Sequence, residues 1–298
     1  MGCFRREAKT FEQVESALMA SALALLSSLL WGSADYIAGN LSKKFPAIAV
    51  LAVSQAIGFL TGIVLVVATG AWGAEAFGSN GYFIPGVLAG FTGYLGLISL
   101  YAALSTGRMG VVSPISSLSA LIPLAFALFY KGDQLSTILS IGVVCAMLGA
   151  FLASGPEVSQ GLPLKPVLLA LSAAFFFGIT LVCMAIGSES SALMTMTTMR
   201  TTTLIIGIAL LVRFRHVGGL GKPQMPLLVF IGVADFAANL LLGVATTKGL
   251  VSLAMVLGAL YPIATALLAY IFLHERLHRV QYFGIAFAVV GVGLISAF

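Results

Sequence analysis

Residues 103–154 read ALSTGRMGVVSPISSLSALIPLAFALFYKGDQLSTILSIGVVCAMLGAFLAS, and residues 245–296 read ATTKGLVSLAMVLGALYPIATALLAYIFLHERLHRVQYFGIAFAVVGVGLIS. The two stretches align without a gap. Identical residues recur along them, among them the pairs Ala103 and Ala245, Gly107 and Gly249, Leu118 and Leu260, Gly142 and Gly284, and Gly149 and Gly291. Asp133 also meets another acidic residue, Glu275. Chance matches are frequent in apolar sequence, but a shared glycine register and a shared acidic position indicate an internal duplication.

The composition excludes a water-soluble fold. Hydrophobic residues make up 60% of the 298 residues, charged residues make up 8%, and the mean hydropathy is +1.09. A soluble domain carries about 25% charged residues, so we expect this chain to lie in a lipid bilayer. The net charge of +5 comes from basic residues scattered between apolar runs. That scatter gives no support for a nucleic-acid partner.

Ten apolar runs are each long enough to cross a hydrocarbon core of about 30 Å at about 1.5 Å per residue. They cover roughly residues 17–39, 47–69, 82–105, 111–130, 136–154, 165–187, 192–212, 226–247, 252–273 and 280–298. Short connections join them. Residues 1–16 are polar and of mixed charge, which predicts a solvated N-terminal tail.

The duplication divides the runs into a first repeat, residues 17–154, and a second repeat, residues 165–298. Trp31-Gly32 in the first run lines up with Phe177-Gly178 in the sixth. Because each repeat holds five runs, an odd number, the two repeats must enter the bilayer in opposite directions. We therefore expect an all-α membrane protein with ten transmembrane helices arranged as two inverted five-helix repeats. Its expected location is the cell (inner) membrane, as a multi-pass protein.

An even number of crossings places both termini on the same side of the membrane. If that side is the cytoplasm, most basic residues between the runs lie outside, whereas the positive-inside rule favours the reverse. The sequence leaves both orientations open.

Small residues and prolines mark where helices are expected to pack or bend. Gly86, Gly90 and Gly93 fall on one face of the third run, and such a face lets two helices approach closely in lipid. Pro114 and Pro123 lie inside the fourth run and Pro262 lies inside the ninth, and all three predict kinks. These kinks are consistent with hinges and equally with static bends.

Three charged residues lie well inside apolar runs: Asp35, Arg200 and Asp235. A charge at a helix centre costs at least about 2.5–3.5 kcal/mol, so each of them needs a partner or a wet cavity. Arg200 and Asp235 lie at similar depth, near the middle of their runs, which makes them a candidate ion pair. Asp35 lies nearer to a membrane edge.

Polar neighbours extend this candidate site. Asn239 follows Asp235 by one turn on the same helix face. In the first run, Trp31 and Asp35 share one helix face. Gln55 occupies in the first half the position that Arg200 occupies in the second, when the halves are aligned. Together these residues predict a polar cavity near the bilayer midplane.

Each charged residue has a proposed role in such a cavity. Arg200 would bind a substrate carboxylate or phosphate through its planar guanidinium. Asp235 or Asp35 would bind an ammonium group or carry a coupling proton, and Trp31 would stack on the ligand. A carboxylate held by a guanidinium is not free to take a proton, so a proton-carrying Asp235 would have to separate from Arg200 during transport. The alternative is a buried ion pair that only joins the helices.

The segment His274-Glu275-Arg276-Leu277-His278 matches H-E-x-x-H, the zinc-protease motif. On a helix its two histidines face one way, and the glutamate could act as a base on a metal-bound water. A zinc site needs a third protein ligand, yet no His, Asp, Glu or Cys follows His278. The equivalent segment 131–135 keeps the acid and the leucine and lacks both histidines. Despite the missing third ligand, a membrane-embedded zinc metalloprotease is kept as the alternative function.

Several segments resemble the EamA-type branch of the drug/metabolite transporter superfamily. They are Trp31-Gly32, Gly232-Val-Ala-Asp235, Lys248-Gly249-Leu-Val-Ser252, Leu260-Tyr261-Pro262 and Leu273-His-Glu275-Arg-Leu277. The resemblance covers nearly the whole chain. It implies a fold of two inverted five-helix repeats around a central cavity, and secondary transport of small metabolites, often the export of amino acids or related compounds.

The leading hypothesis is a secondary active transporter that exports a small metabolite, such as an amino acid or a related polar or amphipathic solute, by alternating access. Its substrate site would consist of Arg200, Asp235, Asn239, Trp31, Asp35 and Gln55. The expected partners are the solute, the lipid bilayer and, as a candidate coupling ion, the proton. No cofactor and no enzymatic activity are expected. A passive channel is a third option, but the polar residues are too sparse to line a continuous pore.

Overall fold

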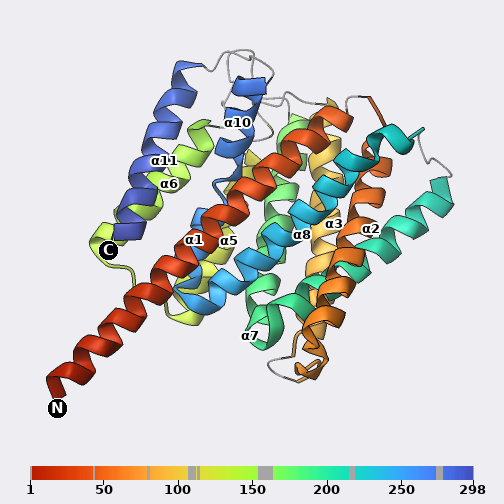
Figure 1. Cartoon of the computed structure of the whole chain (residues 1–298). Helices are drawn as coiled ribbons and strands as arrows, with labels where there is room; N and C mark the ends of the chain where they lie inside the picture. The colour runs from red at the N-terminus through yellow and green to blue at the C-terminus, as the bar shows by residue number, and fades with distance from the viewer. Residues whose placement is uncertain are drawn as a thin grey trace.

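The protein is all-helical throughout the residues that the structure describes (Figure 1). The computed structural model describes residues 2–42, 44–78, 81–106, 112, 115–153, 164–214, 219–272 and 278–297. The first repeat contributes α1 (Gly2–Ser42), α2 (Ala47–Thr69), α3 (Phe83–Thr106), α5 (Leu121–Phe126) and α6 (Thr137–Ala153). The second repeat contributes α7 (Leu164–Phe214), α8 (Met225–Lys248), α9 (Val251–Gly258), α10 (Tyr261–Phe272) and α11 (Arg279–Ala297).

Among the described residues, seven helices are long and apolar enough to cross a membrane, and two shorter apolar helices, Ile115–Lys131 and Thr137–Ala153, accompany them. One of the seven, Leu164–Leu210, has 47 residues. At about 1.5 Å per residue it is long enough to cross the hydrocarbon core twice. The helical multi-pass fold is therefore confirmed, and the number of ten crossings remains a prediction.

The outer surface is suited to lipid. Large apolar side chains such as Val64, Phe129, Ile205 and Phe283 are exposed on it. A soluble protein of this size would not expose so many large apolar side chains together.

One predicted boundary differs from the structure. Residues 2–16, expected as a solvated tail, continue α1 as a helix. The sixth and seventh runs, predicted as separate helices, are the two segments of α7, which meet at Ser191, a residue with non-helical backbone angles (φ −163°, ψ 112°). The chain turns back at this point (Figure 1). The Ser191 hydroxyl accepts a hydrogen bond from the Met194 N–H at 3.2 Å, so it caps the second segment of α7 as an N-cap residue does.

The fourth and ninth runs, predicted as single helices, are broken. The fourth consists of a 3₁₀ turn, the short α5 and a π-helical turn at Ala127–Lys131. The ninth is divided into α9 and α10, with Pro262 at the start of α10. Proline lacks the N–H that an internal helical turn needs, but the first turn of a helix leaves that group unbonded anyway. Pro123 and Pro262 thus lie in runs where the helix is interrupted, and Pro114 lies outside the described residues.

Packing between the last helices of the two repeats explains the shared glycine register. The helices α6 and α11 lie side by side (Figure 1). Gly149 faces the backbone of Ala288, and Gly291 faces the backbone of Ala146. A side chain at either glycine would collide with the partner helix, since only glycine permits so close an approach. Both repeats therefore need glycine at the same positions.

The glycine face of α3 packs against α7, as predicted. A Cβ atom at Gly90 would lie 2.6 Å from the Met199 carbonyl oxygen, and one at Gly86 would lie 2.8 Å from the Thr198 Cβ. Gly93 differs, because a Cβ there would lie at an ordinary 3.5 Å from Thr180. Only the first two positions are therefore restricted to glycine by close packing.

Both chain termini lie at the same end of the bundle (Figure 1), here called the termini end. Polar contacts join the two repeats there. The Asp133 carboxylate accepts hydrogen bonds from the N–H and the hydroxyl of Ser252, at 2.8 and 2.7 Å, and so caps the start of α9. Lys131 forms an ion pair with Glu189 beside the turn of α7. Glu275, the repeat equivalent of Asp133, lies outside the described residues.

Candidate functional site

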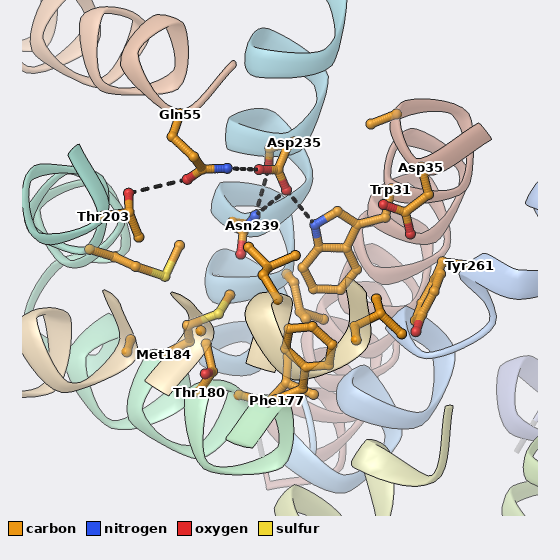
Figure 2. Close-up of a pocket in the computed structure, with 18 of the residues that line it drawn as sticks. Trp31, Asp35, Gln55, Phe177, Thr180, Met184, Thr203, Asp235, Asn239 and Tyr261 are labelled. Atoms are coloured by element: carbon orange, nitrogen blue, oxygen red, sulfur yellow. Dashed lines mark hydrogen bonds between the residues drawn. The ribbon is translucent and has the colours of Figure 1, made fainter. Parts of the chain in front are cut away.

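A cavity of about 180 Å³ lies between the two repeats. The six residues predicted for the site all line it, namely Trp31, Asp35, Gln55, Arg200, Asp235 and Asn239 (Figure 2). They come from α1, α2, the second segment of α7 and α8. Residues far apart in the sequence are thus brought to one enclosed space, because the repeats pack face to face.

The cavity extends toward the end of the bundle opposite to the termini. Ala38 of α1 and Val50 of α2 line it, and both lie within about one turn of the helix ends there. Toward the termini end it is bounded by Met184, Leu242 and Met255, which are all buried. The contacts of Asp133 with Ser252 and of Lys131 with Glu189 lie farther toward the termini end.

The predicted ion pair between Arg200 and Asp235 is present. Arg200 Nη2 lies 2.9 Å from Asp235 Oδ2. Gln55 joins both partners, because its Nε2 donates to Asp235 Oδ2 at 3.1 Å and its Oε1 accepts a hydrogen bond from Arg200 Nη1. The Thr203 hydroxyl also donates to Gln55 Oε1, at 3.2 Å. The amide of Gln55 therefore links α2 to α7 and α8 through this pair.

The second carboxylate oxygen of Asp235 is bound from two other sides. Trp31 Nε1 of α1 donates to Oδ1 at 3.0 Å, and Asn239 Nδ2 donates to the same atom at 3.1 Å (Figure 2). Together with Gln55 and Arg200, four donors surround one carboxylate. Both oxygens of the Asp235 carboxylate are therefore contacted by protein groups.

Burial differs within the ion pair. Arg200 is only 4% exposed, whereas the Asp235 side chain is 24% exposed. The Arg200 Nε is buried and has no hydrogen-bond partner among the described residues, and it lies close to Gly58 of α2. The guanidinium is thus held behind the carboxylate, which is the group that faces the cavity.

Asp35 lies one helical turn after Trp31 on α1 and is not part of this network. Its side chain is enclosed by the bundle but exposed to the cavity, close to Tyr261 (Figure 2). No side chain among the described residues donates a hydrogen bond to it. The Tyr261 hydroxyl bonds to Ser116 instead.

Opposite the polar residues the cavity is apolar. We call Trp31, Gln55, Arg200, Asp235 and Asn239 the polar wall. The apolar wall consists of Leu97 of α3 and of Phe177, Leu181 and Met184 in the first segment of α7. A ligand that fills the cavity would therefore contact polar groups on one side and hydrocarbon on the other.

Sequence reasoning missed Thr203, Tyr261 and the apolar wall. Thr203 follows Arg200 by three residues, a spacing that places both on adjoining parts of one helix face. Phe177 and Leu181 match Trp31 and Asp35 in the alignment of the first and sixth runs. The repeat register thus contained the signal for the apolar wall.

Most of the zinc-protease motif lies outside the described residues. His274, Glu275, Arg276 and Leu277 lie outside them. Within the part of the chain that the structure describes, no group of three His, Cys, Asp or Glu side chains could hold a metal ion.

Comparisons with known proteins agree with the two-repeat organisation. The model of the EamA-like transporter family matches twice, over residues 18–155 and 164–297. A solved structure titled only "Crystal structure of protein" superimposes with a TM-score of 0.74 at 18% sequence identity, covering 92% of this chain and 94% of its own. At that identity it shows the fold alone. No curated protein matches the sequence.

Proposed function

Because this chain belongs to the EamA-like transporter family, whose members are membrane transporters, we propose that it is a secondary active transporter of a small solute. The proposed solute is an amphipathic metabolite, such as an amino acid or a related compound, and the proposed direction is export. The family match gives no support to the alternative of a zinc protease.

One observation carries this proposal: the polar wall and the apolar wall enclose a single cavity at the interface of the repeats. A charged network deep in a lipid-embedded bundle is costly and marks a functional site by default. The donors from Trp31 and Asn239 approach Asp235 from the cavity side. A polar group of the solute would exchange with these donors, while its apolar part lies against Phe177 and Leu181.

Alternating access is proposed as the mechanism. The contacts of Asp133 with Ser252 and of Lys131 with Glu189 close the termini end. Opening that end requires both contacts to break while the helices around the cavity mouth come together. Two inverted repeats provide two such arrangements of similar energy, because each repeat takes the role of the other.

Proton coupling is a further part of the proposal. Asp235 is bound by four donors, so it would take a proton only after it separates from Arg200. The charge-neutral variant Asp235→Asn tests this role in liposomes with an imposed pH gradient. Loss of pH-driven uptake with retained exchange down the solute gradient is expected. Retained pH-driven uptake would exclude Asp235 as the proton carrier.

The decisive experiment is a solute-uptake screen in proteoliposomes at opposed pH gradients. Arg200→Gln removes the buried cation of the polar wall and is expected to abolish the flux of any transported solute. Lys44→Gln is the matched control, because Lys44 is exposed and does not line the cavity. Equal fluxes for the unmodified chain and for a folded Arg200→Gln variant would overturn the site assignment.

A further inference from the structure

Asp35 is the acid of the cavity that the polar wall does not use. The Asp235 oxygens are bound by four donors, whereas no described side chain donates to Asp35. Both carboxylates nevertheless line the same space. A charged carboxylate that faces a lipid-embedded cavity without a partner is energetically unfavourable unless a ligand pairs with it.

The charges around the cavity do not balance. Its charged lining residues are Asp35, Arg200 and Asp235, and the last two form an ion pair. Basic residues on the helices that pack against α1 lie only at helix ends. The described parts of α2, α9 and α10 contain none, and those on α8 and α11 are Lys248, at the last position, and Arg279, at the first. When Asp35 is ionised, the cavity has one unbalanced negative charge, which favours a cation in a low-dielectric space.

Aromatic rings lie next to this carboxylate. The Trp31 and Tyr261 rings meet edge to face, with centroids 6.2 Å apart and planes at 76°. Tyr261 is close enough to Asp35 for a direct electrostatic interaction. Figure 2 shows both rings beside the Asp35 side chain. An aromatic face attracts ammonium groups, most strongly when water is excluded.

We propose that Asp35, Trp31 and Tyr261 form a binding subsite for the ammonium group of an organic cation. The proposal rests on the transport function proposed above and names its substrate class. The ammonium group lies against the carboxylate and the two rings, and the apolar part of the solute extends toward Phe177 and Leu181. A solute carboxylate finds no free cation, because the Arg200 guanidinium is already paired and 4% exposed. Among the amphipathic solutes proposed above, the cavity thus prefers those with a free ammonium group to anions.

The test measures binding with a charged probe and a neutral one. The chain has two tryptophans, so Trp72→Phe leaves Trp31 as the only indole and makes its fluorescence a local reporter. The purified full chain is titrated at pH 7 with 2-phenylethylammonium and with 2-phenylethanol. Asp35→Asn is expected to weaken binding of the ammonium probe by about tenfold, the loss of one charge-assisted contact. Binding of the alcohol should not change.

The controls separate a lost charge from a damaged cavity. Unaltered binding of 2-phenylethanol shows that the Asp35→Asn variant is folded, and Asp35→Glu is expected to keep most of the preference for the cation. The subsite is overturned if the unmodified protein does not bind the ammonium probe, or if Asp35→Asn leaves the ratio of the two affinities unchanged. An Asp35→Asn variant that loses the pH dependence of uptake but binds the cation as before also overturns it, because Asp35 would then carry a proton. Failure of the transport function looks different: no solute flux would depend on Arg200.

Discussion

The helices α8 and α3 occupy equivalent positions in the two repeats but give the cavity opposite chemistry. In the register that pairs Ala103 with Ala245, they begin and end at matching residues. Asp235 of α8 corresponds to Gly93 of α3, and Asn239 corresponds to Leu97. All four of these residues line the cavity.

The same contrast separates α1 from the first segment of α7. Trp31 and Asp35 lie on the polar side, whereas their equivalents Phe177 and Leu181 lie on the apolar side. The duplication thus preserved helix length and glycine packing and altered the residues that face the ligand. Both repeats contribute equally to the fold, whereas the polar wall is proposed to bind the charged end of the solute and the apolar wall to bind the rest.

The largest expected effect comes from breaking the ion pair of the polar wall. Asp235→Ala leaves the guanidinium of Arg200 buried with only the Gln55 contact. Removing one partner of a buried ion pair costs about 3–5 kcal/mol. We expect this loss in the free energy of unfolding of the detergent-solubilised protein, together with loss of transport.

The matched control replaces both charges at once. In Arg200→Met/Asp235→Leu, no charge remains unpaired, and such replacements of buried pairs are often neutral or stabilising. We expect stability near that of the unmodified protein and no transport. If Asp235→Ala unfolds no more readily than the double variant, the pair does not dominate the polar wall energetically.

A smaller effect is expected when an acidic residue is introduced on the apolar side of the cavity. Gly93→Asp places an acid at the position equivalent to Asp235, where no arginine faces it. An unpaired charge at this depth costs at least about 2.5–3.5 kcal/mol. Chemical denaturation in detergent measures the loss.

The control for this prediction is Gly93→Ala. Its Cβ would lie at an ordinary 3.5 Å from Thr180, so we expect no collision and a stability within about 1 kcal/mol of the unmodified protein. Any change should be a gain in stability, because alanine is more favourable than glycine inside a helix. At Gly90 a Cβ would lie 2.6 Å from the Met199 carbonyl oxygen, and alanine is expected to destabilise by about 1–3 kcal/mol. Equal effects of Gly93→Asp and Gly93→Ala would show that the apolar wall accepts a charge.

The sequence was sufficient for the pairing of Arg200 with Asp235, because charges at equal depth in lipid have few other partners. Gln55 followed from the alignment of the halves, and the α3 glycine face followed from helical spacing. The contact between Trp31 and Asp235 did not follow. It depends on how α1 is rotated about its axis, and in lipid-facing helices both faces are apolar, so the periodicity that sets this rotation in soluble proteins is weak.

The breaks within predicted helices were also beyond the sequence analysis. Pro262 indicated a kink, but the division into α9 and α10 depends on how the chain satisfies its backbone groups at that point. The reversal within α7 was predicted, because the polar residues 188–191 separate the sixth apolar run from the seventh. The capping role of Ser191 was not predicted, because the sequence does not single out one residue of this polar stretch.

The smallest expected effect compares one threonine from each side of the cavity. On the apolar side, the hydroxyl oxygens of Thr180 and Thr92 lie 2.8 Å apart, but each hydroxyl can instead donate its single proton to a carbonyl oxygen of its own helix. Thr180→Val should therefore cost only about 0.6 kcal/mol, the average for a hydrogen bond between helices in a membrane. Binding of 2-phenylethylammonium should remain nearly unchanged.

On the polar side, the Thr203 hydroxyl can donate its single proton to Gln55 Oε1 at 3.2 Å or to the Arg200 carbonyl oxygen of its own helix at 3.0 Å. The Gln55 amide in turn holds both members of the ion pair. Thr203→Val should cost a similar amount of stability, because one hydrogen bond of the same kind is lost in each variant. Its effect on ligand binding should be larger, since Gln55 gains freedom to turn away from Asp235. Equal losses of probe affinity in the two valine variants would mean that hydrogen bonds on either wall position the ligand alike, and the division into a polar and an apolar wall would lose its functional meaning.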